Sequence, residues 1–293
     1  MLEKNIKNAF GDKGMSWLHS LPCLIEKLSR YWSLTNIEPA NNMNWNYVAY
    51  ATQYQKTKVV LKMSCDPALI SSEYRALRHF DGHGAIKLFD YSEEFHAILL
   101  EHALPGCSLK ENGPAQITET IYSYSQVVKS ISLLNLPSSS FPHVSTWLAA
   151  VDHIRDERID KRHVEKAKQL KSHLLKSLQE EYLCHGDLHL ENIIQNRNDW
   201  LAIDPKEIIG EIAFEAAAFD LLSDDERNDT QTSQSKIVDR VRQLSNALNI
   251  DNDRLLSWIF LRMMLSAQWF VEDKGNPSRM LQLADYVYPL LKN

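Results

Sequence analysis

CHGDLHLEN occupies residues 184–192, and two strand-like runs follow it, IIQ at 193–195 and WLAID at 200–204. A turn at residues 197–199 would fold these runs into a hairpin centred on residue 198. Because residues 192 and 204 are equidistant from that centre, the hairpin returns Asp204 beside Asn192. Amide and carboxylate oxygens are the hard ligands that Mg²⁺ prefers. The stretch therefore predicts a magnesium site next to a short polar loop.

Asp187 lies five positions before Asn192, which is the spacing of a protein-kinase catalytic loop. In that loop the aspartate accepts the proton of the acceptor hydroxyl and the asparagine holds a magnesium ion. Phosphoryl transfer requires little more of a protein than this base, the metal ligands and a lysine for the triphosphate. We therefore predict Asp187 as the catalytic base, with Asn192 and Asp204 as the metal ligands.

Two other interpretations of the loop stay open at this point. Four of its side chains could form a zinc cluster: Cys184, His185, Asp187 and His189. Histidines four positions apart would bind zinc from one face of a helix, whereas Gly186 favours a loop. The stretch could also be a buried polar turn, with His185 hydrogen-bonded in the core. That interpretation does not account for Asp204.

The region upstream of residue 104 is rich in strand-like segments. An amphipathic helix is predicted at 17–32, and strands are predicted at 45–51, 58–63, 85–91 and 96–102. Asp66 and Pro67 are a favourable helix start, with Asp66 as the N-cap and Pro67 at the first helical position.

Lys62 ends the strand VVLK, and Glu73 follows eleven residues later on the helix that begins after Asp66. A strand lysine held by a helix glutamate is how kinases direct an ammonium group at the α- and β-phosphates. The alternative is an exposed lysine and an unrelated exposed glutamate.

The pattern changes at Leu104-Pro105-Gly106. Beyond it, helices are predicted at 115–134, 144–158, 160–181 and from about residue 211, with a polar loop at 223–235. We expect an α+β fold of two lobes: a nucleotide-binding lobe at 1–103 with a small antiparallel sheet, and a larger, mainly helical lobe at 104–293 that carries the catalytic and acceptor-binding residues.

The composition narrows the class of partner. A net charge of −6 and a pI of about 6.0 argue against a nucleic-acid partner. The longest apolar run, 258–271, contains Arg262 and Gln268 and is too short to span a membrane. The first residues do not resemble a signal peptide, and the four cysteines are widely spaced, as expected for reduced thiols. We expect a cytoplasmic protein with a small-molecule acceptor; nothing indicates its oligomeric state.

Segments along nearly the whole chain resemble one family. They include NYVAYA and VVLK, LLEHALPG, HGDLHLENII, and the most specific piece, IDPK at 203–206. These segments are similar to the aminoglycoside phosphotransferase-like kinases, and most closely to their streptomycin 6-kinase and hydroxyurea-kinase branch.

The resemblance implies a bilobal protein-kinase-like fold and an ATP-dependent enzyme that uses Mg²⁺; the choice between ATP and GTP stays open. It places Asp187 on the catalytic aspartate, and Asn192 and Asp204 on the metal ligands. The pair of Lys62 and Glu73 corresponds to the phosphate-binding pair. Glu101 to Ala103 correspond to the linker whose backbone binds adenine.

The acceptor is less well defined. Candidate contacts are His189, Lys206, Glu211 and Glu215, and more carboxylates lie at 220 and 224–226. They could line a pocket for a guanidinium or amine group, or they could be a solvated helix face and loop. The leading prediction is transfer of a phosphoryl group to a hydroxyl of an aminoglycoside-like or other small acceptor. The alternatives are a catalytically weak nucleotide-binding regulator and a kinase acting on a protein partner.

Overall fold

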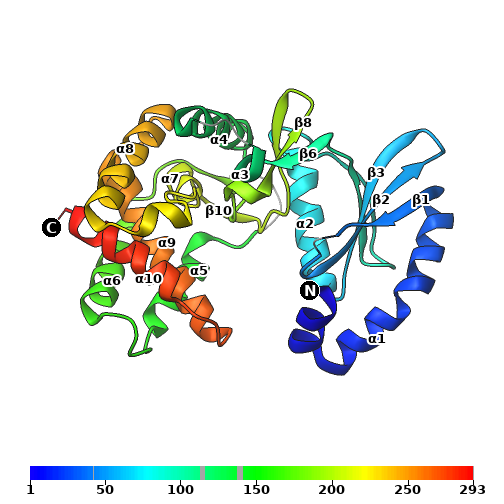
Figure 1. Ribbon diagram of the computed structural model, residues 1–293, viewed down its shortest axis with the longest axis horizontal. Helices are drawn as coiled ribbons and strands as arrows, with labels where there is room; N and C mark the ends of the chain where they lie inside the picture. The colour runs from blue at the N-terminus through cyan, green and yellow to red at the C-terminus, as the bar shows by residue number, and fades with distance from the viewer. Residues whose placement is uncertain (42, 113–115, 137–140, 293) are drawn as a thin grey trace. The chain divides into compact units, whose positions relative to one another are not determined.

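The computed structural model describes residues 1–41, 43–112, 116–136 and 141–292. The chain forms two compact units, one of residues 1–106 and 195–199 and the other of residues 107–194 and 200–293 (Figure 1). Each unit has its own secondary structure and core.

The N-terminal unit is built on a five-stranded antiparallel sheet in the order β1-β2-β3-β5-β4. The strands are β1 (Leu34–Pro39), β2 (Asn46–Gln53), β3 (Thr57–Ser64), β4 (Leu88–Ser92) and β5 (Ala97–Glu101). The strands predicted at 45–51 and 58–63 are confirmed as β2 and β3, which pair antiparallel, and those predicted at 85–91 and 96–102 are confirmed as β4 and β5. β1 was not predicted, because most of its residues are exposed and its sequence lacks an apolar alternation.

Alternation along β3 assigns its side chains to two environments. Val59, Leu61 and Met63 are buried in a cluster with residues of α1 (Leu2–Tyr31). Lys62 lies between them in sequence and therefore points to the opposite face, where α2 (Pro67–Phe80) packs against β3, β4 and β5. Lys62, the buried lysine of β3, therefore lies on the face of the sheet that α2 covers.

Both helices of this unit begin or bend at recognisable residues. Asp66 caps α2 by accepting a hydrogen bond from the backbone N–H of Ala68 at 2.9 Å, as predicted. The opening helix is longer than the predicted 17–32, since it begins at Leu2. It is interrupted at Gly11, whose φ of 53° breaks the helical path.

The C-terminal unit is mainly helical. Its helices are α3 (Leu109–Asn112), α4 (Ile117–Ser132), α5 (Val144–Leu148), η1 (Ala149–His153), α6 (Lys161–Lys176), η2 (Leu190–Asn192), α7 (Ile212–Ala216), η3 (Asp224–Arg227), α8 (Thr230–Leu248), α9 (Asn252–Glu272), α10 (Ser278–Val287) and η4 (Tyr288–Leu290). α9 is the central helix, because it packs against α6, α7, α8, α10 and η1 (Figure 1).

Two short sheets lie outside the five-stranded sheet. β7 (Glu181–Cys184) pairs antiparallel with β10 (Ile208–Glu211). β6 (Pro105–Ser108), β8 (Ile193–Asn196) and β9 (Asp199–Ala202) form a three-stranded sheet in the order β6-β8-β9. The α+β class, with a small antiparallel sheet in the N-terminal unit and a mainly helical C-terminal unit, is confirmed.

Two predicted elements of this unit need correction. The segment 144–158 is not one helix, since α5 is followed by a 3₁₀ turn that ends at His153. The helices predicted from about residue 211 do begin there, with α7 at Ile212, although the short strand β10 before them was not predicted. The loop predicted at 223–235 contains η3 and the start of α8, where the Asp229 carboxylate accepts from the Thr232 N–H at 2.7 Å. Across the described residues, no helix has the length and apolar character needed to cross a membrane.

Candidate active site

The β7–β10 pair fixes the start of the polar loop. Cys184, the last residue of β7, lies opposite Ile208 of β10, and the loop begins at the next residue. Gly186 has a φ of 82°, and a Cβ there would approach Trp147 to 3.0 Å and Ile208 to 3.2 Å. Both the backbone conformation and the packing therefore require glycine at this position.

His185 is fully buried and holds the loop from inside. Its Nε2 lies 2.7 Å from the Ile203 carbonyl oxygen, and its Nδ1 accepts from the Asp187 N–H at 3.2 Å. Burial lowers the pKa of His185 to about 4, so the ring is neutral near pH 7. With both ring nitrogens engaged, His185 is not a zinc ligand. No group of three or more His, Cys, Asp or Glu side chains among the described residues is arranged to hold a metal ion.

Asp187 is partly exposed and has a basic side chain near each carboxylate oxygen. Its Oδ1 lies 3.6 Å from Nη2 of Arg262, and its Oδ2 lies 3.9 Å from Nε2 of His189. A carboxylate that is both held by the protein and open to solvent can accept a proton from a ligand hydroxyl.

Asn192 and Asp204 come together through the predicted hairpin. Asn192 donates from Nδ2 to the Asp187 carbonyl oxygen at 2.9 Å, which leaves its amide oxygen as the second polar atom. The Ile203 N–H donates to the Asn192 carbonyl oxygen at 2.9 Å, so Asp204 follows the residue opposite Asn192. Asp204 is not on the strand as predicted: β9 ends at Ala202, and Asp204 has a φ of 60° in the turn beyond it.

Lys62 and Glu73 form a buried ion pair in the N-terminal unit. The Lys62 ammonium lies 2.8 Å from Oε1 and 2.7 Å from Oε2 of Glu73. Lys62 is 3% exposed and Glu73 is 5% exposed. The two side chains therefore meet as their positions on a strand and a helix indicated, and the interpretation as two exposed charges is wrong.

The linker residues lie at the end of β5. The Glu101 N–H donates to the Lys87 carbonyl oxygen at 2.9 Å, and its carboxylate accepts from Nδ2 of Asn196 at 2.9 Å. Ala103 is buried. The Glu101 side chain is thus engaged within its own unit, and adenine binding remains a prediction for the backbone of this segment.

Glu211 is not placed to bind an acceptor. It is fully buried, and its two oxygens accept from Nε and Nη2 of Arg254 at 2.6 Å each. Trp258 Nε1 and the Gln179 N–H also donate to this carboxylate. Four donors saturate it, so Glu211 is a structural ion-pair residue and the acceptor interpretation is wrong.

Glu215 also lies in the interior, at 3% exposure. Its Oε2 accepts from the N–H groups of His185 and Gly186, while Oε1 has no hydrogen-bond partner. Glu215 therefore holds the backbone of the loop from the protein interior. The prediction that it contacts the acceptor is corrected, because its side chain is buried. Of the remaining candidates, Lys206 is exposed and His189 lies beside Asp187.

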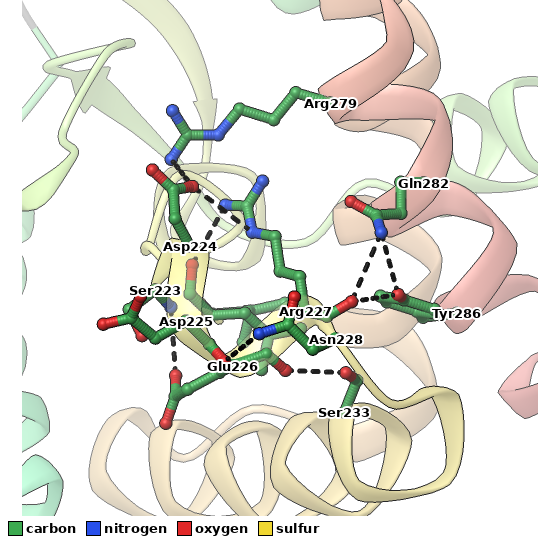
Figure 2. Close-up of polar contacts among 12 residues, drawn as sticks. Ser223, Asp224, Asp225, Glu226, Arg227, Asn228, Ser233, Arg279, Gln282 and Tyr286 are labelled. Carbon is green, nitrogen blue, oxygen red and sulfur yellow. Dashed lines mark hydrogen bonds and ion pairs between the residues drawn. The ribbon is translucent and has the colours of Figure 1, made fainter.

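The downstream carboxylates divide into two kinds. Glu226 accepts from Arg240 at 2.6 Å through both oxygens and from Lys236 at 3.0 Å, which holds its pKa well below the usual range. Asp224 is largely exposed and lies 3.1 Å from Arg279 (Figure 2). Glu226 also caps η3 through the Ser223 N–H at 3.0 Å, so it is a structural residue.

Arg262 is the residue near the loop that was not predicted to belong to the site. It lies on α9 in the apolar run 258–271, and its Nη2 donates to the Gly186 carbonyl oxygen at 2.6 Å. A charged residue inside a buried helix was the only sequence signal, and it did not indicate which loop the side chain would reach.

Comparisons with known proteins identify the family. Residues 42–274 match the family described as aminoglycoside/hydroxyurea antibiotic resistance kinase. Streptomycin 6-kinase of Streptomyces glaucescens is 26% identical over 286 residues, covering 93% of this chain and 90% of the relative. Hydroxyurea phosphotransferase of Kitasatospora aureofaciens is 23% identical, covering 90% of this chain and 77% of the relative.

Solved structures show the same fold at low identity. Choline kinase LicA from Streptococcus pneumoniae has a TM-score of 0.65 at 14% identity, covering 92% of this chain and 99% of that one. A thermostable mutant of aminoglycoside phosphotransferase APH(4)-Ia, in a ternary complex with ADP and hygromycin B, has a TM-score of 0.65 at 12% identity, covering 90% and 97%. The fold is therefore protein-kinase-like, as the sequence resemblance implied.

The family match covers well over half of the chain, and the relatives are a streptomycin 6-kinase and a hydroxyurea phosphotransferase. The molecule is accordingly a nucleotide-using kinase for a small-molecule acceptor. The chain belongs to the aminoglycoside/hydroxyurea antibiotic resistance kinases.

Proposed function

We propose that the chain transfers the γ-phosphoryl group of ATP to a hydroxyl of an aminoglycoside-like acceptor, with Asp187 as the general base. The observation that carries the proposal is the exposure of the Asp187 carboxylate. Its side chain is partly open to solvent, while its backbone N–H donates to the buried His185 and Arg262 lies beside one of its oxygens. The N-terminal lobe binds the nucleotide in this proposal, and the C-terminal lobe holds the base and the metal ligands.

The residues around the base fit a bound Mg²⁺ ion. Asn192 and Asp204 supply an amide and a carboxylate oxygen, both hard ligands, and the Ile203–Asn192 hydrogen bond keeps their backbones adjacent. When bound there, Mg²⁺ would neutralise charge on the phosphates. Hydrogen bonding of Asn192 Nδ2 to the Asp187 carbonyl oxygen turns the amide oxygen away from that carbonyl and makes it available as a ligand.

Lys62 is proposed to bind the α- and β-phosphates. Its ammonium is held by both oxygens of Glu73 in a buried position, and such a pair is costly to bury unless its geometry is fixed. A positioned ammonium is what phosphate binding requires, and the linker backbone at Glu101 to Ala103 is proposed to bind the adenine ring.

Streptomycin is the first acceptor to test, because two matching relatives are streptomycin 6-kinases at 25–26% identity. Glu211, Glu215 and Glu226 have internal partners, which removes three of the six carboxylates that were candidates to bind its guanidinium groups. His189, beside Asp187, and the exposed Lys206 remain proposed acceptor contacts. Hydroxyurea is the second acceptor to test, given the hydroxyurea phosphotransferase relative.

The experiment measures ADP formation and phosphorylated acceptor with MgATP, for the wild type and for Asp187→Asn. Loss of a positioned general base should lower kcat by roughly 10²-fold or more, while the affinity for ATP stays within about threefold. Asp199→Asn, an exposed aspartate of β9, is the matched control and should keep wild-type turnover. Wild-type turnover in Asp187→Asn would refute the assignment of the base.

A further inference from the structure

The two peptide groups that flank Gly186 are held by two buried side chains, the guanidinium of Arg262 and the carboxyl group of Glu215. On the carbonyl side, Nη2 of Arg262 donates to the Gly186 oxygen at 2.6 Å. On the amide side, Oε2 of Glu215 accepts from the Gly186 N–H at 3.3 Å and from the His185 N–H. A hydrogen bond to a charged group is about twice as strong as a neutral one, so the Arg262 bond fixes the Gly186–Asp187 peptide plane, while Glu215 holds the two N–H groups before it.

Arg262 is itself held in place. Its guanidinium carbon lies 5.2 Å from the centroid of the Phe214 ring, within the range of a cation–π contact. Phe214 in turn packs edge-on against Trp147 and Trp258, with ring centroids 6.1 Å and 5.5 Å away. The Arg262 side chain is only 11% exposed. A charge surrounded in this way has little freedom to move.

The same guanidinium also faces the proposed base. Its Nη2 lies 3.6 Å from Oδ1 of Asp187, whereas the other carboxylate oxygen lies on the side of His189. Attraction between the guanidinium and Oδ1 holds the carboxylate in one rotation. Oδ2 is then the oxygen available to an acceptor hydroxyl.

We propose that Arg262 is a positioning residue that fixes the Gly186 peptide and orients the Asp187 carboxylate for proton transfer. The inference rests on the proposed function of Asp187 and assigns Arg262 no contact with substrate. A planar guanidinium can stack on Phe214 while one nitrogen serves both the carbonyl and the carboxylate. A lysine ammonium has neither the plane nor the reach to do both.

The test compares Arg262→Lys with Arg254→Lys. Both arginines lie on α9, and their side chains are 11% and 10% exposed, but Arg254 binds the structural carboxylate of Glu211. Each variant is assayed for ADP formation from MgATP, once with streptomycin and once without any added acceptor. In the second assay water is the phosphoryl acceptor, so phosphoryl transfer can be followed even if streptomycin is not a substrate. Thermal unfolding is measured alongside.

Misplacing a catalytic group by about 1 Å can cost roughly 10²-fold in rate, so we expect Arg262→Lys to lower kcat by about 10- to 100-fold. Its KM for ATP should stay within about threefold, since the nucleotide is not touched. Arg254→Lys should lose thermal stability and keep kcat within about threefold. Arg262→Gln, which retains one neutral donor nitrogen, is the second variant and should lose at least as much kcat as Arg262→Lys.

The double variant Asp187→Asn/Arg262→Lys separates the inference from the proposed function. If Arg262 acts through Asp187, the double variant is no slower than Asp187→Asn alone, within about threefold. A loss equal to the product of the two single losses would overturn the inference and leave the base assignment standing, as would equal kcat values in the two arginine-to-lysine variants. Wild-type turnover in Asp187→Asn, or no ADP formation by the wild type, would refute the proposed function and the inference with it.

Discussion

Glu211 and Glu215 are four residues apart, yet their surroundings give them different electrostatic roles. The carboxylate of Glu211 has a buried arginine as its partner, whereas that of Glu215 binds backbone N–H groups of the loop through one oxygen only. Residue type and position in the sequence could not separate these cases, because Arg254 lies 43 residues beyond Glu211 in the chain.

Replacing Glu211 should affect stability and not substrate binding. In Glu211→Gln, the buried Arg254 loses its anionic partner, and removing one member of a buried pair typically costs about 3–5 kcal/mol. We expect a loss of this order in the free energy of unfolding, measured by urea denaturation. Glu165→Gln on the exposed face of α6 is the control. An unchanged unfolding midpoint together with a raised KM for streptomycin would restore Glu211 as an acceptor contact.

Glu215 should make stability depend on pH. Burial raises its pKa to about 7 from an ordinary value of 4.5, and the nearby Arg262 and the loop N–H groups only partly oppose this. Because the folded chain binds the proton more tightly, the group contributes stability that is full below pH 4.5 and is lost as the pH rises through about 7. At about 1.4 kcal/mol per pKa unit, the contribution is on the order of 3 kcal/mol.

Glu215→Gln removes this titration. We therefore expect the wild type to lose stability relative to Glu215→Gln as the pH rises from 5 to 8, so that the difference in Tm, wild type minus variant, decreases over this range. Thermal unfolding in a series of buffers at constant ionic strength measures the difference. A difference that stays constant across the series would show that Glu215 keeps one protonation state throughout.

At the scale of elements, the tight packing of the loop that follows β7 can be tested by comparing two glycines with nearly the same φ. Gly186 has a φ of 82° and Gly82 a φ of 80°, but a Cβ at Gly186 would meet Trp147 at 3.0 Å, whereas the nearest atom at Gly82 is 3.9 Å away. We expect Gly186→Ala to cost about 1–3 kcal/mol more than Gly82→Ala in urea denaturation, because only the former is overpacked. It should also lower kcat, since the loop carries Asp187. Equal costs would mean that the loop relaxes freely.

The elements that could be predicted are those specified by local sequence. Asp66 and Pro67 define the start of α2 by themselves, and alternation in VVLK directs Lys62 toward that helix. The pairing of Lys62 with Glu73 followed from these two facts. In contrast, β10 has only four residues, Ile208–Glu211, and becomes a strand because β7 pairs with it. Such non-local pairing leaves no periodic signal in the sequence.

The difference between local and non-local signals also explains which residues of the candidate site could be predicted. The catalytic-loop spacing and the hairpin after it are local, so Asp187, Asn192 and Asp204 could be identified together. The partners that hold the loop come from α7 and α9, which are far along the chain, and so the positions of Glu215 and Arg262 could not be predicted. The acceptor-binding residues depend on which carboxylates the fold buries, and burial is decided by the packing of the whole unit.

At the scale of the whole molecule, ligand binding should raise stability by mass action, because a ligand that binds only the folded chain stabilises it by RT ln(1 + [L]/Kd). At a nucleotide concentration of about 100 Kd, this amounts to about 2.7 kcal/mol. The kinase fold and the family membership make ATP the ligand to use, and Mg²⁺ should increase the effect if Asn192 and Asp204 hold the ion.

Asp204→Asn tests that last condition. Asparagine tolerates the φ of 60° at this position, so the variant should fold, but it lacks the negative charge that attracts a divalent cation. We expect ATP with EDTA to stabilise the wild type and the variant alike, and added Mg²⁺ to raise the Tm further in the wild type only. Asp199→Asn, on the exposed start of β9, should respond as the wild type does. An equal Mg²⁺-dependent shift in Asp204→Asn and the wild type would show that Asp204 shapes the turn after β9 and does not bind the metal.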